Sequence, residues 1–163
     1  LLDVEAVLGG VGDGFDPGSA RRVSVAELEE ARRLAGVEWR PGDVMVLHTG
    51  YLEWYLDQDR STRERIAAAD SEFTAVGLDR GPEMLAYLWD SGAAAVGADN
   101  PAVESGPFDP SEAARPFGFL HSCLIGQLGM ALGELGTVVE VSVQGGRVTV
   151  RTSLGGVIEG GRT

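Results

Sequence analysis

The sequence predicts an α/β domain of the mixed α+β type over residues 1–135, followed by a Val/Gly-rich tail, residues 136–163, that contains a β-hairpin. Residues 44–47 are a continuous apolar run, as in a strand covered on both faces. Residues 82–98 read as a helix followed by a strand of small residues, a common unit of such domains. Residues 138–152 alternate Val with polar residues around Gly145-Gly146, which is typical of a hairpin.

The remaining elements follow from spacing and from helix start and stop signals. Residues 1–10 and 24–36 carry apolar residues at helical spacing, and Ser24 with Glu27 forms a capping box. Pro82 suits the first turn of the next helix, which Gly92 closes. Residues 52–73 read as an irregular loop followed by a short helix. Residues 121–128 are expected to be helical, Gly129 to stop that helix, and residues 130–135 to be extended.

Composition excludes several classes of function. The chain has 25 acidic residues against 13 basic ones, all of them Arg, and a formal charge of -12. Such a surface repels nucleic acid and anionic lipid, so a small neutral or cationic partner is expected. Cys123 is the one cysteine, which excludes an internal disulfide and is typical of a cytoplasmic protein. No apolar run approaches 20 residues, so no membrane-spanning helix is expected.

His121 and Glu134 are the candidate metal and catalytic residues. Their separation places them on different faces of one helix, so they can meet only if Gly129 or Gly133 lets the chain turn back. Imidazole and carboxylate suit Zn²⁺ or Mn²⁺, but a catalytic metal takes three or more protein ligands. Taken alone, His121 is more typical of a structural histidine, and so is His48 at the end of a strand.

Other candidates lie near the strand ends. Asn100 follows the strand predicted at 94–98, where functional groups gather in open α/β sheets, and it is a candidate substrate-binding residue. Tyr51 and Trp54 could wall a pocket for a planar substrate, although aromatic residues in such a loop are more often packing residues. Cys123 is expected to be a small buried hydrophobe.

Three segments, RPGDVMVLHTGYLEWY, GLDRGPEMLAYLWDSGAAAVGADNPAVE and FLHSCLIGQLGMALGEL, resemble in this order the middle and C-terminal parts of the cyclase family, over residues 1–135. This family includes bacterial kynurenine formamidases and isatin hydrolases. The resemblance implies a swivelling β/β/α fold, Zn²⁺ or Mn²⁺, a homo-oligomer and hydrolysis of a small amide. It also implies that His121 and Glu134 are metal ligands with a catalytic role.

The sequence departs from the family in two places. Nothing in it matches the N-terminal motif H-x-G-T-H-x-D-x-P-x-H that carries the principal metal ligands, so an N-terminally truncated fold with an incomplete metal site is expected. After Leu135 the tail diverges, through natural variation or a change of reading frame. Two functions therefore stay open: a metal-dependent hydrolase resembling arylformamidase in tryptophan catabolism, or an inactive fragment that serves as a binding or oligomerisation module.

Overall fold

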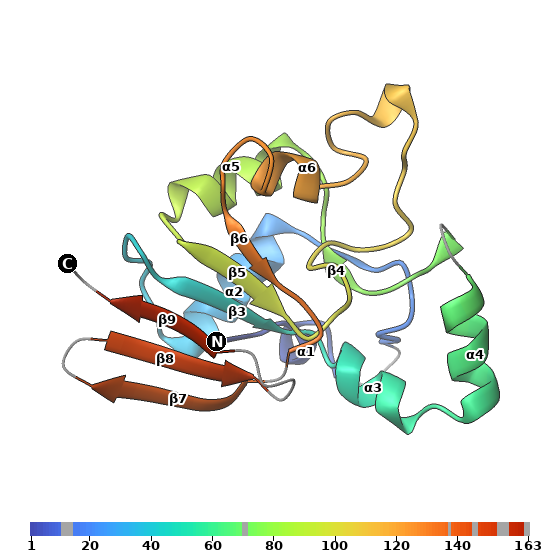
Figure 1. Ribbon diagram of the computed structural model, residues 1–163, viewed down its shortest axis with the longest axis horizontal. Helices are drawn as coiled ribbons and strands as arrows, with labels where there is room; N and C mark the ends of the chain where they lie inside the picture. The colour runs from blue at the N-terminus through green and yellow to red at the C-terminus, as the bar shows by residue number, and fades with distance from the viewer. Residues whose placement is uncertain (11–14, 70–71, 137, 145–146, 153–156, 162–163) are drawn as a thin grey trace.

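A parallel sheet forms the centre of the computed structural model, which describes residues 1–10, 15–69, 72–136, 138–144, 147–152 and 157–161, the last three ranges for their backbone alone. The sheet has the strand order β1-β3-β5-β6 (Figure 1), with strands β1 (Leu2–Asp3), β3 (Val44–His48), β5 (Ala95–Ala98) and β6 (Ala131–Gly133). Val44 pairs with Ala95 and Leu47 with Ala98. The two strands predicted at 44–48 and 94–98 are therefore confirmed as neighbours.

Helices cover the sheet because its strands are apolar on both faces. Helix α2 (Val25–Ala35) lies behind the sheet in Figure 1 and buries Leu28 and Ala31, while α5 (Pro82–Asp90) buries Met84 and Leu88. Ser24 and Glu27 make the expected capping box, and Gly36 ends α2 with a φ of 65°. The most deeply buried large side chains of the core are those of Leu2, Leu28, Met45, Leu47, Tyr51, Leu78, Met84, Leu88, Leu120 and Leu124.

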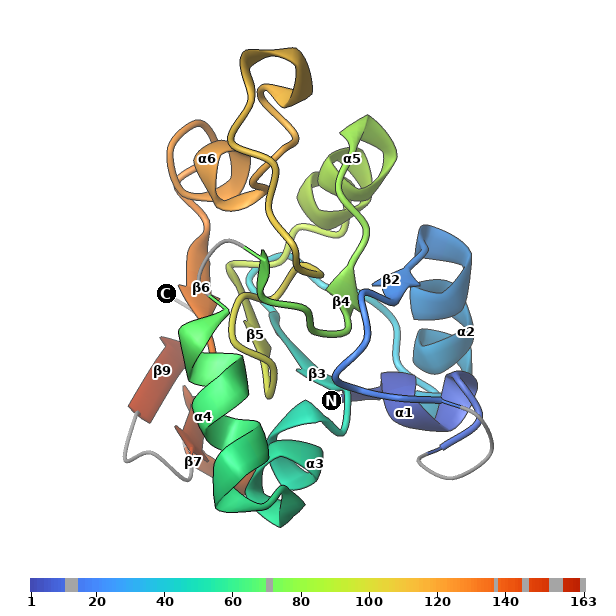
Figure 2. The same ribbon diagram turned by 90° about the vertical axis from the view of Figure 1, so that its right-hand side faces the viewer.

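Two predictions in the N-terminal half were right only in part. Residues 1–10 do not form one helix, because Leu2 pairs with Leu47 in the sheet and leaves only the short helix α1 (Val4–Val7). The short helix expected within 52–73 is confirmed as α4 (Arg60–Ala68), but the irregular loop expected before it is helix α3 (Tyr51–Asp57); the two helices lie next to each other at one side of the molecule (Figure 2). Asp59 starts α4 by accepting a hydrogen bond from the Thr62 amide.

Short elements complete the region after β5. Strands β2 (Arg22–Val23) and β4 (Gly77–Leu78) form a small parallel sheet, and Leu78 also bridges to Glu104. A 3₁₀ turn, η2, spans Glu112–Ala114. Helix α6 (His121–Leu124) is shorter than the predicted 121–128, but Gly129 does turn the chain and residues 131–133 are extended as predicted.

The tail forms a separate antiparallel sheet of β7 (Val138–Gln144), β8 (Arg147–Thr152) and β9 (Val157–Gly161). The two strands of the predicted hairpin are confirmed, while its Gly145-Gly146 turn lies outside the described residues. A third strand, β9, which was not predicted from the sequence, pairs along β8. The burial of the tail valines also lies outside the described residues. No helix in the described part of the chain is long and apolar enough to cross a membrane.

Candidate functional site

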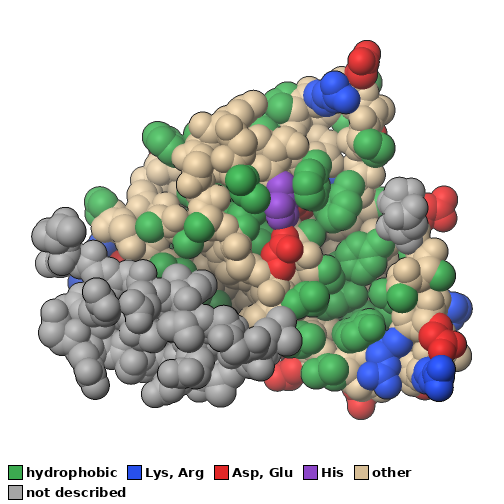
Figure 3. All heavy atoms as spheres, viewed as in Figure 1, with side chains coloured by type: hydrophobic (Ala, Val, Ile, Leu, Met, Phe, Trp, Pro, Cys, Tyr) green, Lys and Arg blue, Asp and Glu red, His purple; other side chains and the backbone are tan. Residues whose placement is uncertain are grey.

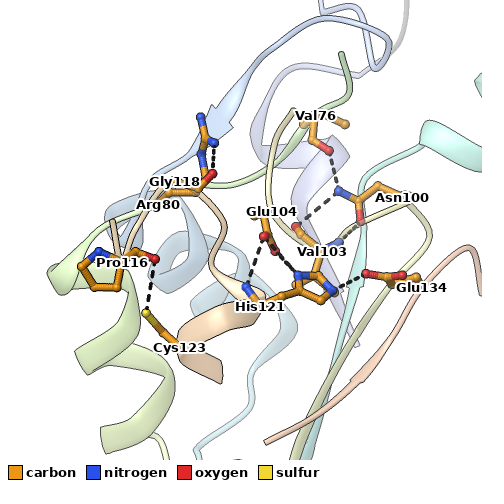
Figure 4. A network of polar contacts seen from close by, with 10 residues as sticks. All are labelled: Val76, Arg80, Asn100, Val103, Glu104, Pro116, Gly118, His121, Cys123 and Glu134. Carbon is orange, nitrogen blue, oxygen red and sulfur yellow. Dashed lines mark hydrogen bonds and ion pairs between the residues drawn. The ribbon is translucent and has the colours of Figure 1, made fainter. Parts of the chain in front are cut away.

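His121 lies between two carboxylates at the start of α6 (Figure 4). Its Nδ1 is 3.0 and 2.9 Å from the two carboxylate oxygens of Glu104, and its Nε2 is 2.7 Å from Oε1 of Glu134. The His121 backbone N–H also donates to Glu104 at 3.3 Å. The Glu104 side chain is completely buried, whereas 34% of the Glu134 side chain is exposed. The imidazole thus joins a buried anchor to a group at the surface.

The chain brings Glu134 to His121 by leaving the helix. Gly129 adopts a φ of 66°, after which β6 runs parallel to β5 and pairs Leu132 with Val96. Glu134 directly follows β6, at the C-terminal end of the sheet. His121 therefore lies near the C-terminal ends of the central strands, and the glycine turn explains how residues 13 apart can meet.

Glu104 is a part of the site that the sequence did not reveal. It follows Val103, whose φ of 58° is unusual for a β-branched residue. The Asn100 side chain holds this turn, because its oxygen accepts from the Val103 N–H at 2.9 Å and its NH₂ donates to Val76 O at 2.6 Å and to Val103 O at 3.3 Å. Glu104 is one of 25 acidic residues, and no spacing rule connects it with His121.

Gly77 in β4 lets the backbone of residues 103–105 pack closely against β4. The Leu78 N–H donates to Val103 O at 2.9 Å, and the Ser105 N–H donates to Leu78 O at 3.0 Å. A Cβ at residue 77 would overlap the backbone of Glu104 and Ser105. The lack of a side chain at Gly77 is therefore needed to place Glu104 under His121.

The two carboxylates favour a protonated His121. Burial opposes the charge, but the hydrogen bond and charge of Glu104, together with Glu134, outweigh burial and raise the pKa of His121. A neutral imidazole has one donor and one acceptor nitrogen, whereas both nitrogens here face carboxylate oxygens. When the ring is neutral, Glu104 would hold the proton on Nδ1 and leave Nε2 as the free base or ligand atom.

An aromatic side chain covers one face of the imidazole. The Phe119 ring is stacked on His121 with centroids 4.5 Å apart and planes 2° apart, and Phe108 contacts Phe119 edge-on at 4.9 Å. Figure 3 shows the histidine at the surface beside an acidic side chain, with hydrophobic side chains around them. The stack restricts rotation of the ring, so Nε2 stays directed at Glu134.

The other sequence-predicted residues lie in packing arrangements. Tyr51 is buried in α3 and contacts Trp54, Tyr55 and Phe73 with centroids 5.4 to 6.2 Å apart; burial raises its pKa to about 12. Asn100 uses its amide on the backbone, as described above. Substrate binding by Tyr51, Trp54 and Asn100 thus stays a prediction. Cys123 is buried as predicted, and burial raises the pKa of its thiol.

A cavity of about 350 Å³ lies beside the site and not over it. Phe119 is the residue that it shares with the histidine cluster. Pro116 and Gly118, which line it, lie on the opposite side of His121 from Glu134 in Figure 4. Its lining residues are Asp109, Pro110, Arg115, Pro116, Gly118, Phe119 and Ser122. The Nε2 atom of His121 therefore does not face this cavity.

The donors present do not make a complete metal centre. His121 Nε2 and Glu134 have suitable chemistry, and a carboxylate on the other ring nitrogen is the usual support of a metal-binding histidine. Among the described side chains, however, no group of three or more His, Cys, Asp or Glu residues could hold a metal ion. A catalytic zinc site takes three protein ligands. The expected Zn²⁺ or Mn²⁺ therefore stays a prediction.

Comparison with known proteins agrees with the fold. The sequence model of the Cyclase family matches residues 1–105, which include Glu104 and end before His121. No curated protein matches the chain. A crystal structure described as a novel cyclase is similar over 82% of this chain, with 26% sequence identity and a TM-score of 0.62, and the match spans 38% of that protein's length. Since the family match takes in well over half of the sequence, the chain belongs to the cyclase family and has a mixed α/β cyclase-like fold.

Proposed function

We propose that the chain contributes part of the active site of a hydrolase that cleaves amide bonds in small aromatic or cyclic substrates, such as an arylformamide or the lactam of isatin. The observation that carries the proposal is the line Glu104–His121–Glu134, in which one imidazole is held by a buried carboxylate and aimed at a partly exposed one. Membership of the cyclase family supports the enzyme class.

Each residue of this line has a separate task. Glu104 fixes the orientation and tautomer of the ring. Neutral His121, with Glu134, can take a proton from the water that attacks the amide carbon. As the C–N bond breaks, the same pair can return that proton to the leaving nitrogen. Both side chains are also suitable ligands for a divalent metal whose other ligands come from an H-x-G-T-H-x-D-x-P-x-H segment.

The second candidate function is that of a binding or oligomerisation module. The small number of metal-binding side chains favours this function. The described part of the chain places two donors together, fewer than a catalytic metal needs. In this case the chain keeps the scaffold of the family and associates with an intact copy or a related subunit. The two candidates differ in whether supplying the missing ligands produces turnover.

The test compares the chain as it stands with a version extended by a segment carrying the H-x-G-T-H-x-D-x-P-x-H motif. Both are assayed with a formanilide and with isatin, with and without Zn²⁺ or Mn²⁺, and the bound metal is measured in parallel. The chain alone should show weak metal binding and no turnover, because two donors do not fix a catalytic metal. The extended protein should bind metal and hydrolyse at least one of the two substrates.

Variants of the extended protein then assign the residues. His121→Ala and Glu134→Ala should each reduce hydrolysis by about 10- to 100-fold or more if they bind or support the metal. Glu64→Ala, on the exposed face of α4, is the surface control and should leave the rate unchanged. Turnover by the unextended chain would contradict the donor count, and wild-type rates in His121→Ala would contradict the hydrolase site. Metal binding without turnover would favour the module.

A further inference from the structure

His48, the second histidine of the chain, joins three elements at the C-terminal edge of the central sheet. It is the last residue of β3, and its Nε2 is 3.0 Å from Oε2 of Glu5 in α1. Its Nδ1 is 3.5 Å from Oδ2 of Asp99, which follows β5. The Asp99 side chain is 4% exposed, while those of His48 and Glu5 are 27% and 22% exposed. Residues far apart in the sequence thus converge on one imidazole.

The geometry favours two protons on this ring. Both ring nitrogens face carboxylate oxygens, which accept hydrogen bonds and donate none when ionised. A neutral ring would direct a lone pair at one of these carboxylates. Asp99 depends more on His48 than Glu5 does, because its Oδ1 accepts from Thr49 N and Oγ1 at 2.7 and 2.6 Å, whereas its buried Oδ2 has no hydrogen-bond donor among the described residues. The contact at 3.5 Å is therefore an ion pair, and the imidazolium compensates the charge on Oδ2.

We propose that Glu5, His48 and Asp99 form a pH-sensitive clamp, which fastens α1 and the end of β5 to the end of β3 while His48 is protonated and weakens when that proton is lost. The clamp is separate from the proposed hydrolase site, and its test does not depend on activity.

The clamp also supports the start of α3. Gly50 has a φ of 76°, and a Cβ at this position would lie 2.8 Å from Oε2 of Glu5, so α1 packs closely on the turn. The Tyr51 N–H points at Thr49 Oγ1 at 3.4 Å, and Thr49 is itself bound to Asp99. Loss of the His48 charge should therefore loosen the 49–51 turn together with α1.

The pH range follows from the groups that face His48. These are Asp99 after β5, Asp3 at the end of β1 and Glu5 in α1. The ion pair with Asp99 and the charges of Asp3 and Glu5 outweigh burial and raise the pKa of His48 to about 9, from an ordinary value of 6.5. Since the folded-state pKa is the higher one, the clamp contributes fully below pH 6.5, and its contribution is lost as the pH rises to about 9.

The first experiment is an NMR titration of the intact chain between pH 5.5 and about 10. Only two histidine Cε1–H resonances are expected, and His48→Gln assigns them. The His48 resonance should titrate near pH 9, and the Thr49 methyl resonance should follow with the same midpoint. Glu5→Gln should lower the midpoint, whereas Glu64→Gln, an exposed control, should leave it unchanged. A His48 midpoint at or below 6.5 would overturn the proposal.

The second experiment measures urea unfolding of wild type, His48→Gln and Glu5→Gln over the same pH range. Wild type should unfold at a higher urea concentration than each variant near pH 6. This difference in urea midpoint should disappear by about pH 10, because wild type then loses by deprotonation the charge pairing that the variants lack at every pH. If His48→Gln does not fold, Glu5→Gln alone gives the comparison. A difference in urea midpoint that stays constant with pH would show that the residues only pack together.

Discussion

The two histidines of this chain lie at the same edge of one sheet, each between two carboxylates, yet their surroundings differ. His121 is in close contact with both of its carboxylates, at 2.9 and 3.0 Å from the completely buried Glu104 and at 2.7 Å from the partly exposed Glu134. For His48 only the contact with the more exposed Glu5 is short, 3.0 Å, while its buried partner Asp99 lies at an ion-pair distance of 3.5 Å.

This difference indicates different tasks for the two rings. A buried carboxylate that holds one ring nitrogen is the usual support of a metal-binding histidine, and here it directs the other nitrogen toward the surface, at Glu134. A ring whose charge compensates a buried carboxylate, while it connects α1, β3 and β5, is suited to holding the fold together. The predictions below separate the anchor of His121 from its surface partner.

Glu104→Ala should give the largest effect. The substitution removes a buried charge that is paired with His121, and breaking such a pair costs about 3–5 kcal/mol of the free energy of unfolding. Urea unfolding monitored by tryptophan fluorescence measures the loss. Glu104→Gln is the matched control, since its amide oxygen can still accept from Nδ1 and the loss should be smaller. A loss from Glu104→Ala under about 1 kcal/mol, the level of an exposed ion pair, would show that the buried pair does not stabilise the fold.

Asn100→Ala should have the next largest effect on stability. It leaves the buried Val76 carbonyl and Val103 N–H without their side-chain partner, at a cost of about 1–3 kcal/mol for each group. The turn that presents Glu104 should also relax, so the NMR resonances of His121 should shift while those of His48 stay in place. Asn100→Asp keeps an acceptor for Val103 but sets a buried carboxylate oxygen against the Val76 and Val103 carbonyls, so it should cost at least as much. A loss under about 1 kcal/mol in Asn100→Ala would argue against the role of these hydrogen bonds.

Gly77→Ala should destabilise the protein by about 1–3 kcal/mol, because the added methyl group overlaps the Glu104 backbone and forces it to shift. The same change in His121 resonances is expected as in Asn100→Ala. Gly81→Ala, at the start of α5, has open space around the new Cβ and serves as the control. Equal stability of the two variants would show that the close approach at Gly77 is easily relieved.

Glu134→Gln should have the smallest effect on stability, under about 1 kcal/mol, because an ion pair with an exposed partner contributes little. Removing its charge should nevertheless lower the raised pKa of His121, which an NMR titration measures. A larger loss of stability than in Glu104→Ala would reverse the assignment of anchor and surface partner.

The sequence predicted the elements that rest on local signals or on continuous apolar runs. The capping box at Ser24, the strands at 44–48 and 94–98 and the turn at Gly129 all have such signals. Glu104 could not be predicted, because its position depends on the left-handed Val103 and on Asn100, which binds Val76 across the fold. Local spacing predicts a helix at residues 1–3, because it contains no information on their long-range pairing with β3.

The strand order of the central sheet also has a consequence for how the protein folds. Every pairing in it is parallel and joins distant residues, such as Leu2 with Leu47 and Val44 with Ala95, whereas β7, β8 and β9 pair with their neighbours along the chain. Non-local pairings form slowly, because the intervening chain must be closed into a loop first. Both histidine clusters depend on these late pairings, so they should be among the last parts of the molecule to assemble.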